Sequence, residues 1–88
     1  MFNLTGLLKK VGIGGSVALS IATFAWKYLG GVRAVEYGWV TISALLKKAA
    51  VAAGAAGLCG LVITAVLAVG LFAFRKKLKA GKSSFIAF

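Results

Sequence analysis

Residues 49–74, AAVAAGAAGLCGLVITAVLAVGLFAF, contain no charged side chain, and this stretch decides the fold class of the chain. At ~1.5 Å rise per residue, a single helix over these residues would be about 39 Å long. The hydrocarbon core of a bilayer is about 30 Å thick, so such a helix is long enough to cross it with some tilt. We therefore predict a transmembrane helix over 49–74, ending at the basic residues 75–77.

The composition of the whole chain also favours a membrane protein. Hydrophobic residues make up 61% of the 88 residues, and the net charge is +10 because 11 Lys and Arg stand against a single acid, Glu36. A chain this short buries only about 60–65% of its surface on folding, so a soluble globule could not hide this much apolar area. We expect one all-α membrane domain over residues 1–88.

A second uncharged run, residues 11–26, predicts another membrane segment. Extended to 7–31 it becomes a first span, because the long stem of Lys27 can carry its charge to the interface. An alternative is a signal peptide with its cleavage site at residues 23–25. Gly30-Gly31 is the expected turn after this segment, since glycine adopts left-handed backbone at no steric cost.

Residues 32–48 lie between the two predicted spans and have apolar side chains at helical spacing. The pattern predicts an amphipathic helix that lies at the membrane interface or packs on its neighbours. The alternative is that this segment continues directly into the second span, because the chain contains no Pro to force a break. The expected architecture is a hairpin of two transmembrane helices with an interfacial helix between them and a basic tail over 75–88. The apolar residues of the interfacial segment are Val32, Val35, Trp39, Ile42 and Leu46.

Small residues recur every four positions in both predicted spans. Lipid tails are as apolar as Leu, so helices in a bilayer associate through close backbone approach, which small side chains permit. We interpret these stripes as helix-packing surfaces, within the chain or between copies, and expect a homo-oligomer or a larger assembly. The first stripe is Gly14, Ala18 and Ala22, and the second is Ala52, Ala56, Gly60, Thr64 and Ala68.

Basic residues gather directly after the second span, and a further pair precedes the uncharged run 11–26. The positive-inside rule places this tail on the cytoplasmic side or in a compartment derived from it. We expect these residues to contact phosphates, either of anionic lipid headgroups or of packaged nucleic acid. No aromatic residue interleaves the bases of the tail, so any nucleic-acid binding would be independent of sequence. The expected contacts are Arg75, Lys76, Lys77, Lys79, Lys82, Lys9 and Lys10.

Enzymatic chemistry is not expected. The chain has no His and one carboxylate, so no nucleophile, base and acid can be assembled from it. One Cys and no His also leave no ligand set for a metal, and we predict no cofactor. The segment Ala80-Gly81-Lys82-Ser83-Ser84 lacks the Gly that a phosphate-binding loop requires five residues before Gly81.

The layout of residues 58–82 resembles the small membrane proteins of phage particles. These are the proteins of lipid-containing phages and the hydrophobic minor coat proteins of filamentous phages. The resemblance rests on an apolar helix rich in Ala, Gly and Val that ends at Phe74 and is followed by Arg-Lys-Lys-Leu-Lys. It implies a multi-pass structural protein of a virion membrane or coat. The acidic N-terminal segment of filamentous major coat proteins is absent.

Other functions stay open on sequence grounds. Two-span phage holins are similar in length and in their basic tail, and they open membranes by oligomerising through helix faces. A few hydroxyls, Ser16, Ser20, Thr23 and Thr64, would have to line such a pore. A cationic bacteriocin-like peptide and an accessory subunit of a membrane complex are further alternatives.

Overall fold

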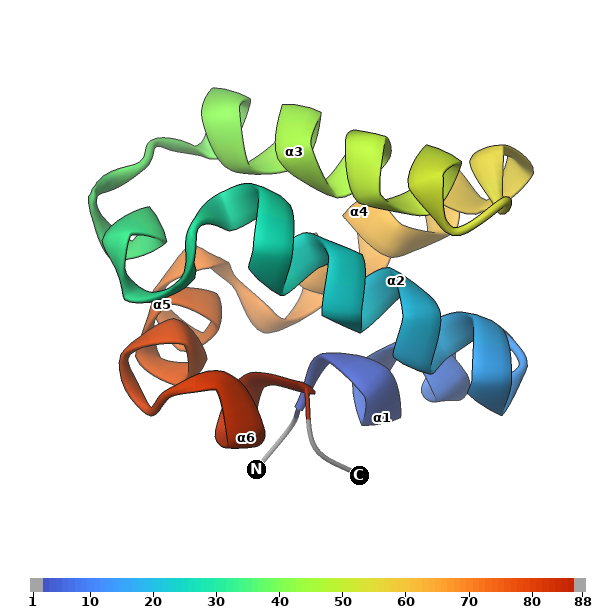
Figure 1. Ribbon diagram of the computed structural model, residues 1–88, viewed down its shortest axis with the longest axis horizontal. Coiled ribbons are helices and arrows are strands. Elements are labelled where there is room, and N and C mark those ends of the chain that lie inside the picture. Colours follow the sequence, from blue (N-terminus) through green and yellow to red (C-terminus); the bar gives the residue numbers. More distant parts are fainter. Residues whose placement is uncertain (1–2, 87–88) are drawn as a thin grey trace.

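The computed structural model describes residues 3–86, of which 83% are helical and none lies in a strand. The all-α prediction is therefore confirmed. The helices enclose one apolar core in a body of 27 × 24 × 21 Å (Figure 1). In chain order they are α1 (Leu4–Lys10), α2 (Gly15–Leu29), the 3-10 helix η1 (Gly31–Glu36), α3 (Trp39–Ala52), the 3-10 helix η2 (Ala56–Leu58), α4 (Cys59–Val69), α5 (Leu71–Lys79) and α6 (Lys82–Ile86).

The centre of the molecule is the pair α2 and α3, which lie side by side and run in opposite directions (Figure 1). Each helix buries residues spaced three or four apart, which is the period of one helix face. The buried residues of α2 are Ala18, Ile21, Ala22, Ala25 and Leu29, and those of α3 are Ile42, Leu46, Ala49 and Ala50. Many of them are alanines, and their small side chains fill the interface between the two helices.

The turn expected at Gly30-Gly31 is confirmed. Gly30 has φ +82° and ends α2, and Gly31 has φ +74° and begins η1. Gly31 also lies against the indole of Trp26, where a Cβ atom would come within 3.2 Å of the ring. Two requirements therefore coincide here, because both the backbone conformation and the space favour glycine.

The single helix expected over 49–74 is wrong, because the chain bends within this stretch. Residues 49–52 form the last turn of α3, which ends before Gly54 (φ +75°). The backbone amide of Ala55 donates to the carbonyl of Ala50 and completes the reversal. A second break falls at Gly70 (φ +89°), where α4 ends and α5 begins. Glycine adopts these positive φ values without the steric penalty of a Cβ atom, so each provides a hinge.

The helix expected over 7–31 is also divided. α1 ends at Lys10, the chain turns at Gly12 (φ +98°), and α2 begins at Gly15. α2 is about 22 Å long at ~1.5 Å per residue, less than the ~30 Å of a hydrocarbon core. Within residues 3–86, no helix alone has the length and apolarity of a membrane span. The pair Ala56–Val69 and Leu71–Lys79 meets both requirements when taken together, with a bend of 91° between its halves.

The segment 32–48 does not form one helix either. η1 ends at Glu36, the backbone is extended at Tyr37 and Gly38, and α3 starts at Trp39 and continues past Lys48. Ile42 and Leu46 are buried, as expected for the apolar face, whereas Val32 is exposed. The predicted boundary between interfacial helix and span, at residue 48, thus falls inside α3.

The basic tail expected over 75–88 folds back onto the core as far as the structure describes it, while residues 87–88 lie outside the described residues. Phe74 of α5 and Phe85 of α6 are fully buried and meet edge to face, with ring centroids 5.5 Å apart. Trp26 of α2 packs on Phe85 at the same centroid distance. The hydroxyl of Thr5 in α1 donates a 2.6 Å hydrogen bond to the carbonyl of Ile86. The two end helices are therefore joined.

Candidate anion-binding surface on α5

The helix α5 is amphipathic. Phe74 and Leu78 are four residues apart and point into the core, where both are fully buried. Phe72, Arg75, Lys76 and Lys79 share the opposite face at a spacing of three and four residues. Three basic residues also stand in the last turn of the helix, where the negative end of the helix dipole stabilises cations. The local sequence thus supports both the helix and its orientation.

Arg75 is held in place by the backbone of a distant segment. Its Nη2 atom donates a 2.7 Å hydrogen bond to the carbonyl oxygen of Tyr37, which follows η1. The side chain is half-buried, and its Nε atom is shielded from solvent without a hydrogen-bond partner among the described residues. A guanidinium has five N–H donors, so most of the donor capacity of Arg75 is not used by Tyr37.

A half-open hollow of about 480 Å³ lies between η1 and α5. Its lining combines three cations with two apolar side chains and contains no acidic residue. Phe72 is 80% exposed, so an aromatic ring stands in open solvent at the rim of the hollow. The arrangement suits an anion that bears an apolar portion. The lining residues are Val35, Phe72, Arg75, Lys76 and Lys79.

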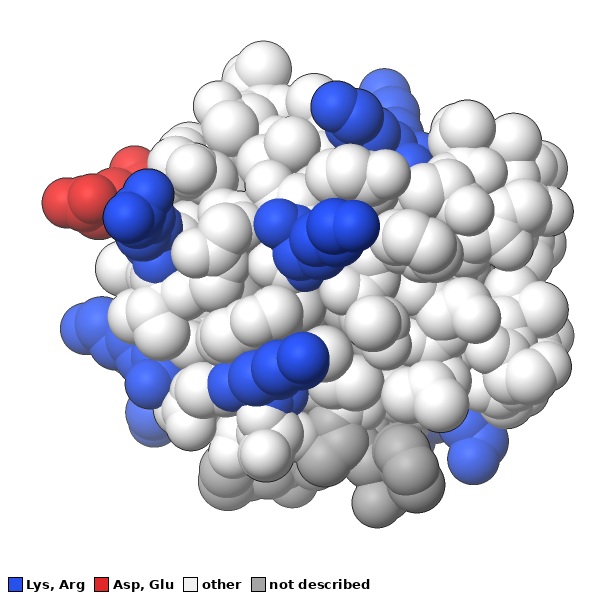
Figure 2. Space-filling view, viewed as in Figure 1, with Lys and Arg blue, Asp and Glu red and all other residues white. Residues whose placement is uncertain are grey.

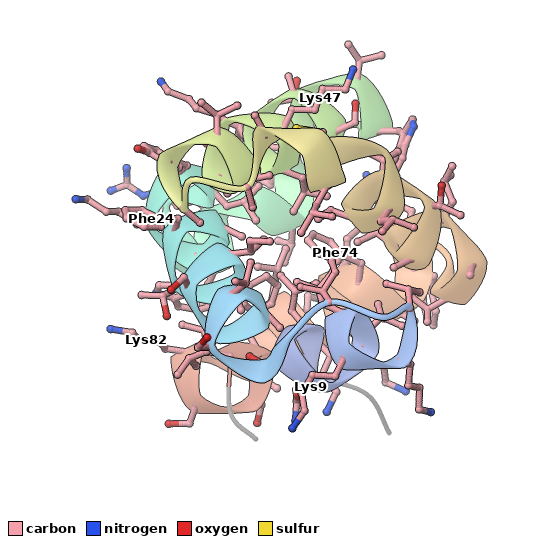
Figure 3. The ribbon with its side chains drawn as sticks, turned by 90° about the vertical axis from the view of Figure 1, so that its right-hand side faces the viewer. Lys9, Phe24, Lys47, Phe74 and Lys82 are labelled. Carbon is pink, nitrogen blue, oxygen red and sulfur yellow. The ribbon has the colours of Figure 1, made fainter. Side chains whose placement is uncertain are left out.

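The other expected phosphate contacts lie elsewhere. Lys9 and Lys10 are exposed at the end of α1, and Lys82 is exposed at the start of α6. Figure 3 shows Lys9 and Lys82 directed away from the body of the molecule near α1 and α6, with Lys47 at the opposite end. Lys77 is half-buried and does not line the hollow. The visible face in Figure 2 has Lys and Arg scattered among uncharged residues.

The two small-residue stripes have different environments. Ala18 and Ala22 are fully buried on α2, while Gly14 is exposed just before that helix. All members of the second stripe are exposed, and they come from three elements: Ala52 from α3, Ala56 from η2, and Gly60, Thr64 and Ala68 from α4. Within the chain, only the first stripe contributes to the core.

Exposed residues of α4 form one uncharged face, which we name the α4 outer face. Leu61 is 41% exposed and Leu67 is 57% exposed. The hydroxyl of Thr64 donates to the carbonyl of Gly60 at 2.8 Å, so the polar group is satisfied inside the helix. This face therefore needs no hydrogen-bond partner from its surroundings. Its members are Gly60, Leu61, Thr64, Leu67 and Ala68.

Sequence reasoning missed two partners of the basic residues. Phe72 shares its helix face with Arg75, Lys76 and Lys79, and the helical spacing of these four residues in the sequence could have indicated this. The carbonyl of Tyr37 had no such signal, because only the tertiary fold brings it to Arg75. A further basic residue, Lys48, has its Nζ atom 5.2 Å from the ring centroid of Tyr28, a cation–π contact between α3 and α2.

The fold and this surface together define a small, strongly basic all-α protein with an uncharged outer face on α4 and a cationic hollow at the following helix, α5. Comparison with protein-family models, curated proteins and solved structures gave no match.

Proposed function

We propose that the protein is a non-enzymatic structural membrane protein, a virion membrane or coat-associated assembly subunit, that binds anionic bilayers through α4 and α5. The observation that carries this proposal is the succession of the uncharged α4 outer face, the exposed ring of Phe72 and the cations of α5. An apolar helix face followed by bases is the pattern by which amphipathic helices enter the headgroup boundary.

The physical basis combines two favourable terms. The α4 outer face and Phe72 lose contact with water when they enter the boundary between headgroups and acyl chains. Lys76 and Lys79 then lie at the depth of the phosphates, where each cation contributes about 1 kcal/mol at an anionic surface. Because this second contribution is electrostatic, added salt weakens it.

Assembly into a particle would use the exposed part of the second stripe. Gly60, Thr64 and Ala68 leave room for another helix backbone to approach α4 closely, and no atom beyond its chain neighbours and the backbone of its own helix lies within 4 Å of a Cβ built on Gly60. A second copy or a coat protein would occupy this position. Packaged nucleic acid is the other possible source of phosphates for the basic residues, and such binding would be independent of sequence.

The test is co-sedimentation with phosphatidylcholine vesicles that contain or lack phosphatidylglycerol. We expect binding that depends on the anionic lipid and falls with salt. The triple substitution Lys76→Gln, Lys77→Gln and Lys79→Gln should weaken binding in a salt-sensitive way. A matched control removes three exposed charges elsewhere, Lys27→Gln, Arg33→Gln and Lys47→Gln. Equal losses of vesicle binding in both triple variants would show that α5 contributes only through the net charge of the protein.

A holin-like function is the second candidate, and one observation favours it. The bent pair Ala56–Val69 and Leu71–Lys79 has the length and apolarity of a span when taken as one segment. Straightening at Gly70 would give a helix of about 36 Å, enough to cross a bilayer. Inducible expression in a bacterium separates the two functions. Abrupt potassium efflux and dye entry at a reproducible time would favour the holin, and intact cells would favour the structural subunit.

A further inference from the structure

The hollow between η1 and α5 differs from a general basic patch in three respects. Its three cations converge from consecutive turns of one helix, its rim carries an exposed aromatic ring, and its only arginine is already oriented. The hydrogen bond from Arg75 to the Tyr37 carbonyl holds the guanidinium at the wall of the hollow. Less side-chain freedom is therefore lost when a ligand binds.

From these features we infer that the hollow is a binding site for one lipid whose headgroup ends in a phosphomonoester, of the phosphatidic acid type. This inference rests on the proposed membrane function and deepens it. A terminal phosphate carries about −1.5 to −2 charge near neutral pH and presents three strong acceptor oxygens. Arg75, Lys76 and Lys79 supply three cationic donors for such a group, and no acidic side chain lines the site to repel it.

The two apolar lining residues provide for the rest of the lipid. Val35 forms part of the wall, and Phe72 stands exposed at the rim, where an aromatic ring at headgroup depth contacts glycerol and the first acyl carbons. The α4 outer face, on the helix that precedes α5 in the chain, is uncharged, which suits acyl chains and offers nothing to a polynucleotide. We therefore assign the phosphate to a lipid.

The role of Arg75 follows from its geometry. Arginine binds phosphate with a planar fork of donors, whereas lysine acts as a point charge. Replacing Arg75 by Lys keeps the charge and removes both the fork and the fixed orientation. Electrostatic binding to any anionic vesicle should survive this change, and selection of the terminal phosphate should be lost.

The experiment compares phosphatidylcholine vesicles containing either phosphatidic acid or phosphatidylglycerol, adjusted to equal surface charge. We expect the full chain to bind the phosphatidic acid vesicles about tenfold more tightly, the factor that one charge-assisted hydrogen bond supplies. Arg75→Lys should abolish this preference and leave binding to phosphatidylglycerol within about twofold. The matched control is Arg33→Lys, which alters the other arginine, an exposed residue that does not line the hollow.

Two further variants keep the test valid if Arg75→Lys disturbs the fold. Phe72 and Lys79 are both exposed, so Phe72→Ala and Lys79→Gln should fold normally and still reduce the preference for phosphatidic acid. Helical circular dichroism of each variant supplies the check on folding.

The remaining outcomes separate this inference from the proposed function. Equal binding to both anionic vesicles at matched charge overturns the inference and leaves the membrane function standing. No binding to either vesicle overturns both. Inhibition of vesicle binding by millimolar inorganic phosphate identifies free phosphate as the ligand and contradicts the lipid assignment. The last outcome is tighter binding to single-stranded oligothymidylate than to phosphatidic acid vesicles, with this binding lost in Arg75→Lys. It would identify nucleic acid as the ligand of the hollow and also contradict the lipid assignment.

Discussion

The guanidinium of Arg75 donates a 2.7 Å hydrogen bond to the backbone carbonyl of Tyr37, 38 positions earlier in the chain. This bond joins α5 to the extended segment between η1 and α3. Arg75 therefore differs from the basic residues that follow it. One N–H group of its guanidinium stabilises the fold, and others remain available for a ligand. The basic segment is therefore a structural element of the fold as well as a candidate site.

Gly70→Ala tests the break between α4 and α5. Gly70 has φ +89° and ψ 151°, a region that only glycine populates readily, so a Cβ atom should cost about 1–3 kcal/mol of folding free energy. Urea unfolding in mild detergent, followed by tryptophan fluorescence, measures this loss. The control is Gly60→Ala in α4, where helical backbone and open space predict a gain of about 0.5–1 kcal/mol. Equal stability of wild type and Gly70→Ala would show that the bend is not required.

Thr5→Val tests the contact between the end helices. The Thr5 hydroxyl is buried and donates to the Ile86 carbonyl, so its removal leaves a buried acceptor unsatisfied. The expected loss is about 1–3 kcal/mol in the free energy of unfolding. Thr23→Val is the matched control, because the Thr23 hydroxyl donates to the Leu19 carbonyl on an exposed part of α2. Similar values for the two variants would contradict the docking of α6 on α1.

Phe85→Ala should lower the stability of the fold, whereas Phe72→Ala should lower vesicle affinity. Phe85 is fully buried against Trp26 and Phe74, so truncation should cost about 3–5 kcal/mol of stability. Phe72 is largely exposed and should change stability by less than about 0.5 kcal/mol while lowering the affinity for anionic vesicles. Unfolding curves and vesicle co-sedimentation on both variants check this. A large loss of stability in Phe72→Ala alone would reverse the assignment of inner and outer faces on α5.

Gly60→Leu tests the second small-residue stripe. Gly60 is exposed, and a Cβ at this position would meet no atom of another element, so the leucine should leave the fold intact and block close approach of another helix to α4. We expect less dimer in a detergent crosslinking assay, with no loss of stability and a gain similar to that of Gly60→Ala, because Leu also has a higher helix propensity than Gly. Ala22→Leu is the contrasting variant, because Ala22 is fully buried and overpacking there should cost about 1–3 kcal/mol. Undiminished crosslinking of Gly60→Leu would exclude the stripe as an interface.

Some features of this fold were readable in the sequence. The helical class follows from the apolar pattern and the absence of Pro, and the turn at Gly30-Gly31 follows from paired glycines after a helix. Ile42 and Leu46 were correctly placed on one apolar helix face, since their spacing is that of α3, where both are buried. These signals are local, and each depends on residues within about two helical turns.

The breaks in the apolar run had no comparable signal. Four glycines occur between residues 49 and 74, and only Gly54 and Gly70 adopt positive φ. Gly60 lies within α4, so glycine alone did not identify the hinges. The choice depends on packing: α3 ends where its buried alanines run out against its neighbours, and α5 turns so that Phe74 reaches Phe85.

By itself, the sequence determined the helical class and the strong positive charge, because these depend on composition and short-range spacing. Only the tertiary structure decided which small-residue stripe is buried, which glycines bend the chain, and that Phe72, Arg75 and Val35 border one hollow. Contacts between residues far apart in the chain make these choices. Their energies depend on the shape of the whole core rather than on any one segment.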